Sequence, residues 1–140
     1  MSSWNLIYIT SNSHSGSTLL DMLIGSHSAC LTLGEIHKLT LKSEGVCACG
    51  AENYRECSFW SDVAARLQAE GGPSLAELCL HSEDDTEFRA MNRALFHVLQ
   101  GKTGCQWFVD SSKKISRLKK LLADSEFNVL PVHIVRRPEG

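Results

Sequence analysis

The sequence has no long apolar run, no internal repeat and no strong excess of charge of either sign. Its 140 residues include 14 Lys and Arg against 16 Asp and Glu, a formal net charge of −2, so no global positive field favours nucleic acid. No stretch approaches the roughly 20 apolar residues of a membrane span. The opening MSSWNLIYIT lacks the basic start and the cleavage pattern of a signal peptide. These absences favour a cytoplasmic protein without nucleic-acid or membrane partners.

Short apolar segments alternate with segments of helical period, which favours an α/β fold with a mainly parallel sheet. A chain of 140 residues is long enough for one domain with a hydrophobic core. We expect an irregular, cysteine-containing insertion at about 37–60. The expected strands are 5–10, 29–36, 105–110 and 128–135, with regular pairing of the last starting after Pro131. The expected helices are 17–27, 61–68, 74–80, 85–99 and 113–123, with a turn at 101–104.

The first and last expected helices are amphipathic. The apolar stripes that we expect on one face of each are Leu19, Leu20, Leu23 and Ile24 in the first, and Ile115, Leu118, Leu121 and Leu122, facing inward, in the last. The last helix also carries a basic run, most of which we interpret as a solvated face: Lys113, Lys114, Arg117, Lys119 and Lys120.

The segment ITSNSHSGSTLL, residues 9–20, has the form of a phosphate-binding loop between a strand and a helix. Against the frame G-x-x-x-x-G-K-[ST], Gly16 and Thr18 match, but Ser11 replaces the first glycine and Ser17 replaces the lysine. Gly16 lets the backbone approach an oxyanion, and the amides from Ser15 to Thr18 would point at it. The missing lysine argues against phosphoryl transfer from ATP. A plain serine-rich turn remains the alternative.

Two later strands also end in groups that bind anions. FVDSSKK, residues 108–114, ends in an acid, two hydroxyl residues and lysines, and VHIVRRP, residues 132–138, ends in two arginines before a proline. Because carboxyl ends of parallel strands meet at one edge of a sheet, these groups are expected to converge with the serine loop.

Together these segments resemble the sulfotransferases that use 3′-phosphoadenylyl sulfate (PAPS), in particular the bacterial and tyrosylprotein sulfotransferases. The matching segments, in family order, are SHSGSTLLDMLIGSH, LTLGEI, CACG…ECSFW, VDSSKKISRL and VHIVRRPEG. The resemblance implies a P-loop-like three-layer sandwich. Since the sequence stops at RRPEG, just after a strand, we expect residues 1–140 to be the N-terminal part of the domain, truncated at its C-terminus, and this fragment to be inactive or weak in binding PAPS.

The resemblance also assigns the residues that would hold PAPS. Ser15, Gly16, Ser17 and Thr18 would bind the 5′-phosphosulfate end, together with His14, which stands where the family has arginine or lysine. Arg136 would pair with the 3′-phosphate, although Arg137 could take its place by a change of register.

Three residues are candidates for the chemistry. Glu35 would remove the proton of the acceptor, with His37 as the alternative base. Lys113 would place a positive charge on the sulfonate and the leaving phosphate. His14 would stabilise the leaving oxygen, or serve as an ordinary hydrogen-bond donor of the loop.

The six cysteines leave three states open. Cys47, Cys49 and Cys57 could bind zinc with His37 as a fourth ligand, could form a disulfide, or could be the free thiols expected in a cytoplasm. Buried free thiols are expected for Cys30, Cys79 and Cys105.

The predicted function is transfer of a sulfonate from PAPS to a hydroxyl or amine, without a metal. The acceptor could be a small molecule, a carbohydrate or a protein. The alternatives are a P-loop nucleotide kinase relative and a non-catalytic nucleotide-binding fragment.

Overall fold

The computed structural model describes residues 3–11, 16–39 and 56–135. The chain divides into two compact units. Met1–Ile36 and Cys105–Gly140 form the first, here called the sheet unit, and His37–Gly104 form the second, here called the helical unit. Most of the expected irregular segment, residues 40–55, lies outside the described residues.

The sheet unit is built on a four-stranded, all-parallel sheet with strand order β2-β3-β1-β4. The strands are β1 (Trp4–Ser11), β2 (Cys30–Thr32), β3 (Trp107–Asp110) and β4 (Phe127–Ile134). The expected α/β class with a parallel sheet is therefore confirmed. The second strand ends earlier than expected. Leu33 still donates to the Val109 carbonyl (2.8 Å), but Gly34 then turns the chain with a φ of +61°.

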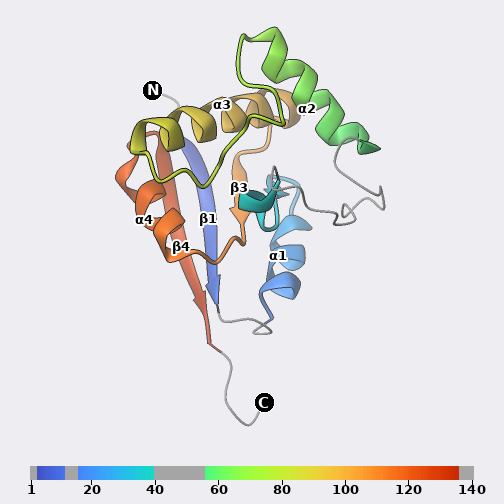
Figure 1. Cartoon of the computed structure of the whole chain (residues 1–140). Helices are drawn as coiled ribbons and strands as arrows, with labels where there is room; N and C mark the ends of the chain where they lie inside the picture. Colours follow the sequence, from blue (N-terminus) through green and yellow to red (C-terminus); the bar gives the residue numbers. More distant parts are fainter. Residues whose placement is uncertain (1–2, 12–15, 40–55, 136–140) are drawn as a thin grey trace. The chain divides into compact units, whose positions relative to one another are not determined.

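Two helical crossovers connect these strands in opposite directions along the sheet. Helix α1 (Ser17–Gly25) leads from β1 to β2, and α4 (Ile115–Ala123) leads from β3 to β4. Right-handed crossovers that run in opposite directions place their helices on opposite faces of a sheet. Figure 1 shows α1 and α4 on either side of the strands. The sheet unit is thus a helix–sheet–helix sandwich.

The apolar core of the sheet unit surrounds the two central strands. Leu6, Ile9, Phe108 and Val109 are fully buried, and Trp4 stacks on Phe127 with ring centroids 5.2 Å apart. The expectation that β4 pairs only after Pro131 was wrong, since pairing starts at Phe127 and Pro131 lies opposite Tyr8. Proline is tolerated there because β4 is an edge strand of the sheet, and no strand among the described residues pairs with its other side.

Helix α4 is rotated away from its expected apolar face. Leu121 is buried and Leu118 half-buried as expected, but Ile115 and Leu122 are 53% and 52% exposed, so the prediction was wrong for those two. The inward position goes instead to Arg117, which is 2% exposed. The basic run is therefore not wholly a solvated face.

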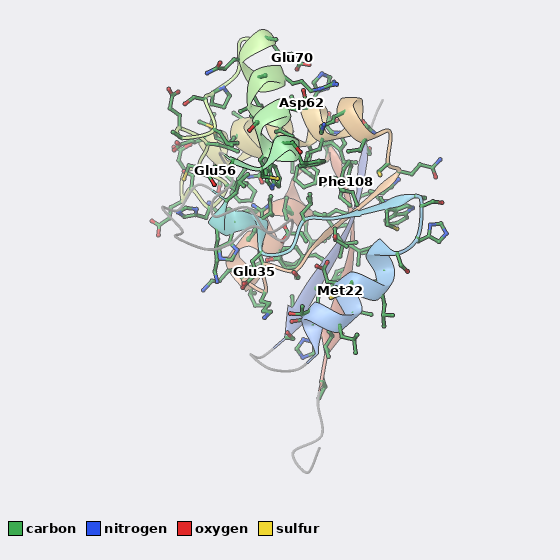
Figure 2. All side chains as sticks on the ribbon, turned by 90° about the vertical axis from the view of Figure 1, so that its right-hand side faces the viewer. Met22, Glu35, Glu56, Asp62, Glu70 and Phe108 are labelled. Atoms are coloured by element: carbon green, nitrogen blue, oxygen red, sulfur yellow. The ribbon has the colours of Figure 1, made fainter. Side chains whose placement is uncertain are left out.

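Helix α1 likewise exposes part of its apolar stripe and buries polar side chains. Its buried residues are Ser17 and Asp21, one turn apart, while Leu19, Met22 and Leu23 are all more than 60% exposed. Figure 2 shows Met22 projecting from α1. Both helices of the sheet unit therefore bury polar side chains, for a reason that the site explains.

The helical unit contains α2 (Ser58–Ala69) and α3 (Asp85–Thr103), and η1 (Ile36–Lys38), a single 3₁₀ turn, spans the boundary between the two units. Asp84 caps α3 by accepting from the Glu87 amide (2.8 Å), and Gly104 ends it in the left-handed conformation. Residues 101–103 therefore continue the helix, contrary to the turn expected at 101–104. The helix expected at 74–80 is only a turn, in which the Glu77 and Leu78 amides donate to the Ser74 carbonyl.

The apolar core of the helical unit is formed by buried aliphatic and aromatic side chains: Val63, Leu67, Leu75, Leu78, Leu80, Phe88, Leu95, Phe96, Val98 and Leu99.

Candidate functional site

The carboxyl ends of all four strands lie at one edge of the sheet, because every pairing is parallel. The register places Tyr8 of β1 opposite Asp110, the last residue of β3, and Ser11 opposite Ile134, the last residue of β4. The segments after β2 and β3 are joined directly, since the Ser111 amide donates to the Gly34 carbonyl (2.9 Å). The expected common edge of the strand ends is therefore confirmed, whereas the meeting of the anion-binding groups there stays a prediction, because residues 12–15 and 136–140 lie outside the described residues.

The start of α1 places amide donors at this edge for which no described residue is an acceptor. Gly16 precedes the helix with a φ of +86°, and no side chain among the described residues caps the helix. The first intrahelical bond runs from the Leu20 amide to the Gly16 carbonyl (3.1 Å), so the preceding amides have no partner within the helix. Ser17 is buried and Thr18 is exposed. His14 and Ser15 lie outside the described residues.

The segment after β3 is held by a buried carboxylate. Asp110 is fully buried, and its two oxygens accept from the Ser112 amide and from Nε of Arg117, each over 2.9 Å. The Tyr8 hydroxyl donates to the Lys114 carbonyl over 2.7 Å. Burial, and then the neighbouring Asp110 charge, raise the pKa of Tyr8, so this hydroxyl keeps its proton. The turn 111–114 is therefore fixed at both of its ends.

Lys113 lies inside that turn with a φ of +68° and is half-buried. It is the only non-glycine residue with a positive φ among the residues that the structure describes. Its ε-amino group makes no hydrogen bond or ion pair with any described residue. It is thus a cation without a structural partner in the described part of the chain, in a segment that begins at the carboxyl edge.

A second carboxylate, Asp21, is buried on the inner face of α1. It is 9% exposed, and its Oδ1 atom has no hydrogen-bond partner among the described residues. Burial, with a smaller contribution from the Asp110 charge, raises the pKa of Asp21 from 3.8 to about 6. Asp21 lies one helical turn after Ser17, so its charge state acts on the helix start at close range.

The other expected site residues are placed less completely. Glu35 is exposed and directly follows Gly34, which accepts the Ser111 amide, so it belongs to the same edge (Figure 2). His37, the alternative base, is buried and belongs to the helical unit. Arg136 and Arg137 lie outside the described residues, one and two residues after Val135.

No disulfide joins two described cysteines, and the expectation that Cys30, Cys79 and Cys105 are buried was wrong, because all three are half-buried, whereas Cys57 is buried. Cys47 and Cys49 lie outside the described residues, so the zinc and disulfide alternatives stay open. Within residues 3–11, 16–39 and 56–135, no group of three or more His, Cys, Asp or Glu side chains could hold a metal ion. None of the helices in these ranges is long and apolar enough to cross a membrane.

Sequence reasoning missed Tyr8, Asp21 and Arg117. Each lies in a segment that the sequence assigns to a regular element, and Arg117 belongs to the basic run that was interpreted mostly as a solvated face. A usable signal exists for Arg117, because an acid that ends a buried strand needs a cation, and Arg117 is seven residues later in the next helix. Comparison of the chain with family models, with curated proteins and with solved structures found no match.

Proposed function

We propose that the carboxyl edge of the sheet unit binds the phosphosulfate end of PAPS and that the chain belongs to a PAPS-dependent sulfotransferase. The observation that carries the proposal is the start of α1, where a left-handed glycine precedes the helix and no described side chain caps it. Such a helix start attracts anions, because its free amides and the helix dipole both favour negative charge.

The order of the strands supports this location. Strand β1 leads through α1 to one side of the sheet, whereas β3, its neighbour, leads through α4 to the other. Ligands of open α/β sheets bind in the crevice where the connections part in this way, at the carboxyl ends of the strands. Here that point lies between β1 and β3, whose following segments contain Gly16 and Lys113.

The roles proposed for the residues follow from the chemistry of sulfonate transfer. Gly16, Ser17 and Thr18, with Ser15 and His14, hold the phosphosulfate, and Arg136 holds the 3′-phosphate. The bond from sulfur to the bridging oxygen breaks as sulfur bonds to the acceptor, and the electron pair stays on adenosine 3′,5′-bisphosphate. Glu35 takes the proton of the acceptor hydroxyl or amine, and Lys113 offsets the charge that grows on the sulfonate and phosphate.

The kinase alternative is less well supported. Phosphoryl transfer uses Mg²⁺, which prefers free carboxylate oxygens. Asp110, the acid at the end of β3, already accepts a hydrogen bond at each of its two oxygens. The residue in the lysine position of the loop is also Ser17, whose side chain carries no charge.

Calorimetric titration of the chain tests the donor site. We expect saturable binding of adenosine 3′,5′-bisphosphate and much weaker binding of ATP with Mg²⁺. Gly16→Ala should weaken the first at least about tenfold, since a Cβ disfavours the left-handed backbone that orients the amides. The matched control is Gly71→Ala, because Gly71 has a similar φ of +74° and likewise nothing within 4 Å of an added Cβ.

Equal affinity of wild type, Gly16→Ala and Gly71→Ala would place the ligand elsewhere. Tighter binding of ATP with Mg²⁺ would favour the kinase alternative. In an extended protein that contains this chain, assayed with [³⁵S]PAPS and a set of hydroxyl and amine acceptors, Glu35→Gln should lower kcat about 10²-fold or more while leaving the affinity for PAPS unchanged.

A further inference from the structure

The turn between β3 and α4 adopts a backbone conformation that its own residues do not favour. Lys113 has a φ of +68°, a region in which the Cβ of an L residue is crowded by the following carbonyl. Such a conformation persists only where the surrounding structure fixes it, and it is found disproportionately at functional positions. The question is which side chains fix it here.

Three buried groups hold the turn. Asp110 accepts the Ser112 amide at the start of the turn, and the Tyr8 hydroxyl donates to the Lys114 carbonyl at its end. Asp110 is held in turn by Nε of Arg117, over 2.9 Å, with both side chains almost fully buried. Lys113 lies between the two fixed points.

Stability alone is a poor reason for this arrangement. A buried ion pair is a weak stabiliser, because removing two charges from water costs most of what their attraction returns, and well-packed apolar side chains are often better. Helix α4 nevertheless buries Arg117 while Ile115 and Leu122 remain more than half exposed. The Arg117–Asp110 pair therefore serves to fix the conformation of the turn and not to fill the core.

We propose that Arg117 is a positioning residue for Lys113. By fixing the Asp110 carboxylate, Arg117 holds the turn 111–114, with the help of Tyr8, in the conformation that presents Lys113 to the sulfonate end of the donor. This inference rests on the proposed function, because it needs a bound donor for Lys113 to contact.

A double-mutant cycle on donor binding tests the proposal, with PAPS titrated in the absence of acceptor. Lys113→Ala should weaken PAPS binding about tenfold, the loss expected for one hydrogen bond to a charged group. Arg117→Met should cause a similar loss, and the double variant should bind no more weakly than Lys113→Ala. Lys119→Met removes a charge from an exposed position of the same helix and should leave the affinity unchanged.

Because Arg117→Met leaves Asp110 buried without its partner and endangers folding, Tyr8→Phe provides a second, milder arm. It removes only the hydroxyl that donates to the Lys114 carbonyl and should weaken PAPS binding about two- to tenfold in wild type, but not in the Lys113→Ala background. Circular dichroism of each variant identifies those that fold.

The outcomes separate this inference from the proposed function. If wild type binds PAPS but Lys113→Ala binds equally well, the donor site stands and the positioning role is overturned. The role is also overturned if a folded Arg117→Met or Tyr8→Phe variant binds like wild type, or if its loss adds to that of Lys113→Ala. If wild type does not bind PAPS, the proposed function fails and the inference with it.

Discussion

The ion pairs of Asp110 in the sheet unit and of Asp62 in the helical unit show how differently charge is used in this chain. In the sheet unit, Arg117 contacts Asp110 over 2.9 Å with side-chain exposures of 2% and 0%. In the helical unit, Asp62 contacts Arg66 over 3.0 Å and Lys102 over 2.6 Å, and these side chains are 20% to 47% exposed. Figure 2 shows Asp62 on α2. The Arg117–Asp110 pair holds a turn at the proposed site, whereas the two pairs made by Asp62 are in contact with solvent.

The cores of the two units follow the same division. In the helical unit, the buried side chains of α2 are apolar and those of α3 are apolar except Asn92. In the sheet unit, α1 buries Ser17 and Asp21, and α4 buries Arg117. Burying polar groups costs free energy. The buried polar side chains of α1 and α4 therefore lower the stability of the sheet unit, and in return they fix the segments at its carboxyl edge.

The largest expected effect comes from breaking the buried pair. Arg117→Met should lower the free energy of unfolding by about 3–5 kcal/mol, because it leaves the Asp110 carboxylate buried without its cation. Urea denaturation followed by circular dichroism measures this loss. Replacing both partners, in Asp110→Asn with Arg117→Met, should recover part of it. A loss below about 1 kcal/mol would show that the pair behaves like a surface pair.

A smaller effect, opposite in sign, is expected at Asp21. Its pKa is 3.8 in the unfolded chain and about 6 in the folded one. Between these values the folded state holds a proton that the unfolded state has lost, so the free energy of unfolding falls as the pH rises from about 4 to 6. Asp21→Asn removes this cost and should stabilise the protein at pH 7.5 by at most about 3 kcal/mol.

The pH dependence provides the internal control for Asp21→Asn. The stabilisation should be largely lost at pH 4, where the Asp21 carboxyl of folded wild type is protonated, and should disappear below about pH 3, where it is protonated in both states. Thermal or urea unfolding at pH 4 and pH 7.5 measures the difference. Equal effects at both pH values would mean that the substituted amide acts through packing or hydrogen bonding and not through the loss of charge.

The smallest effect is expected for the exposed pair. Hydrogen bonds from Lys102 and Arg66 lower the pKa of Asp62, so the stabilisation that they give is present at neutral pH and is lost as the pH falls through the acid range. Because these charges are screened by water, Asp62→Asn should shift the unfolding midpoint less than either change above. Scanning calorimetry at low and at high salt checks this, and a shift that rivals the one for Arg117→Met would contradict the comparison.

The sequence predicts the alternation of strands and helices because apolar periodicity is local. It also predicts that Gly16, Glu35 and Lys113 follow strands at one edge, since parallel strands share that edge. It does not predict how far α1 and α4 are rotated, because only part of each apolar stripe faces inward and polar side chains take the remaining buried positions. Arg117 is buried against Asp110, which lies in a different element, and side-chain period carries no information about such a partner.

The start of α1 is where the whole account is most directly tested, by ¹H–¹⁵N correlation spectra of the chain during titration with adenosine 3′,5′-bisphosphate. The account predicts saturable shifts, with one common dissociation constant, for the amides of Gly16, Ser17 and Thr18, and no shift for Gly71. Unchanged amides at the start of α1, or saturable shifts confined to the helical unit, would contradict it.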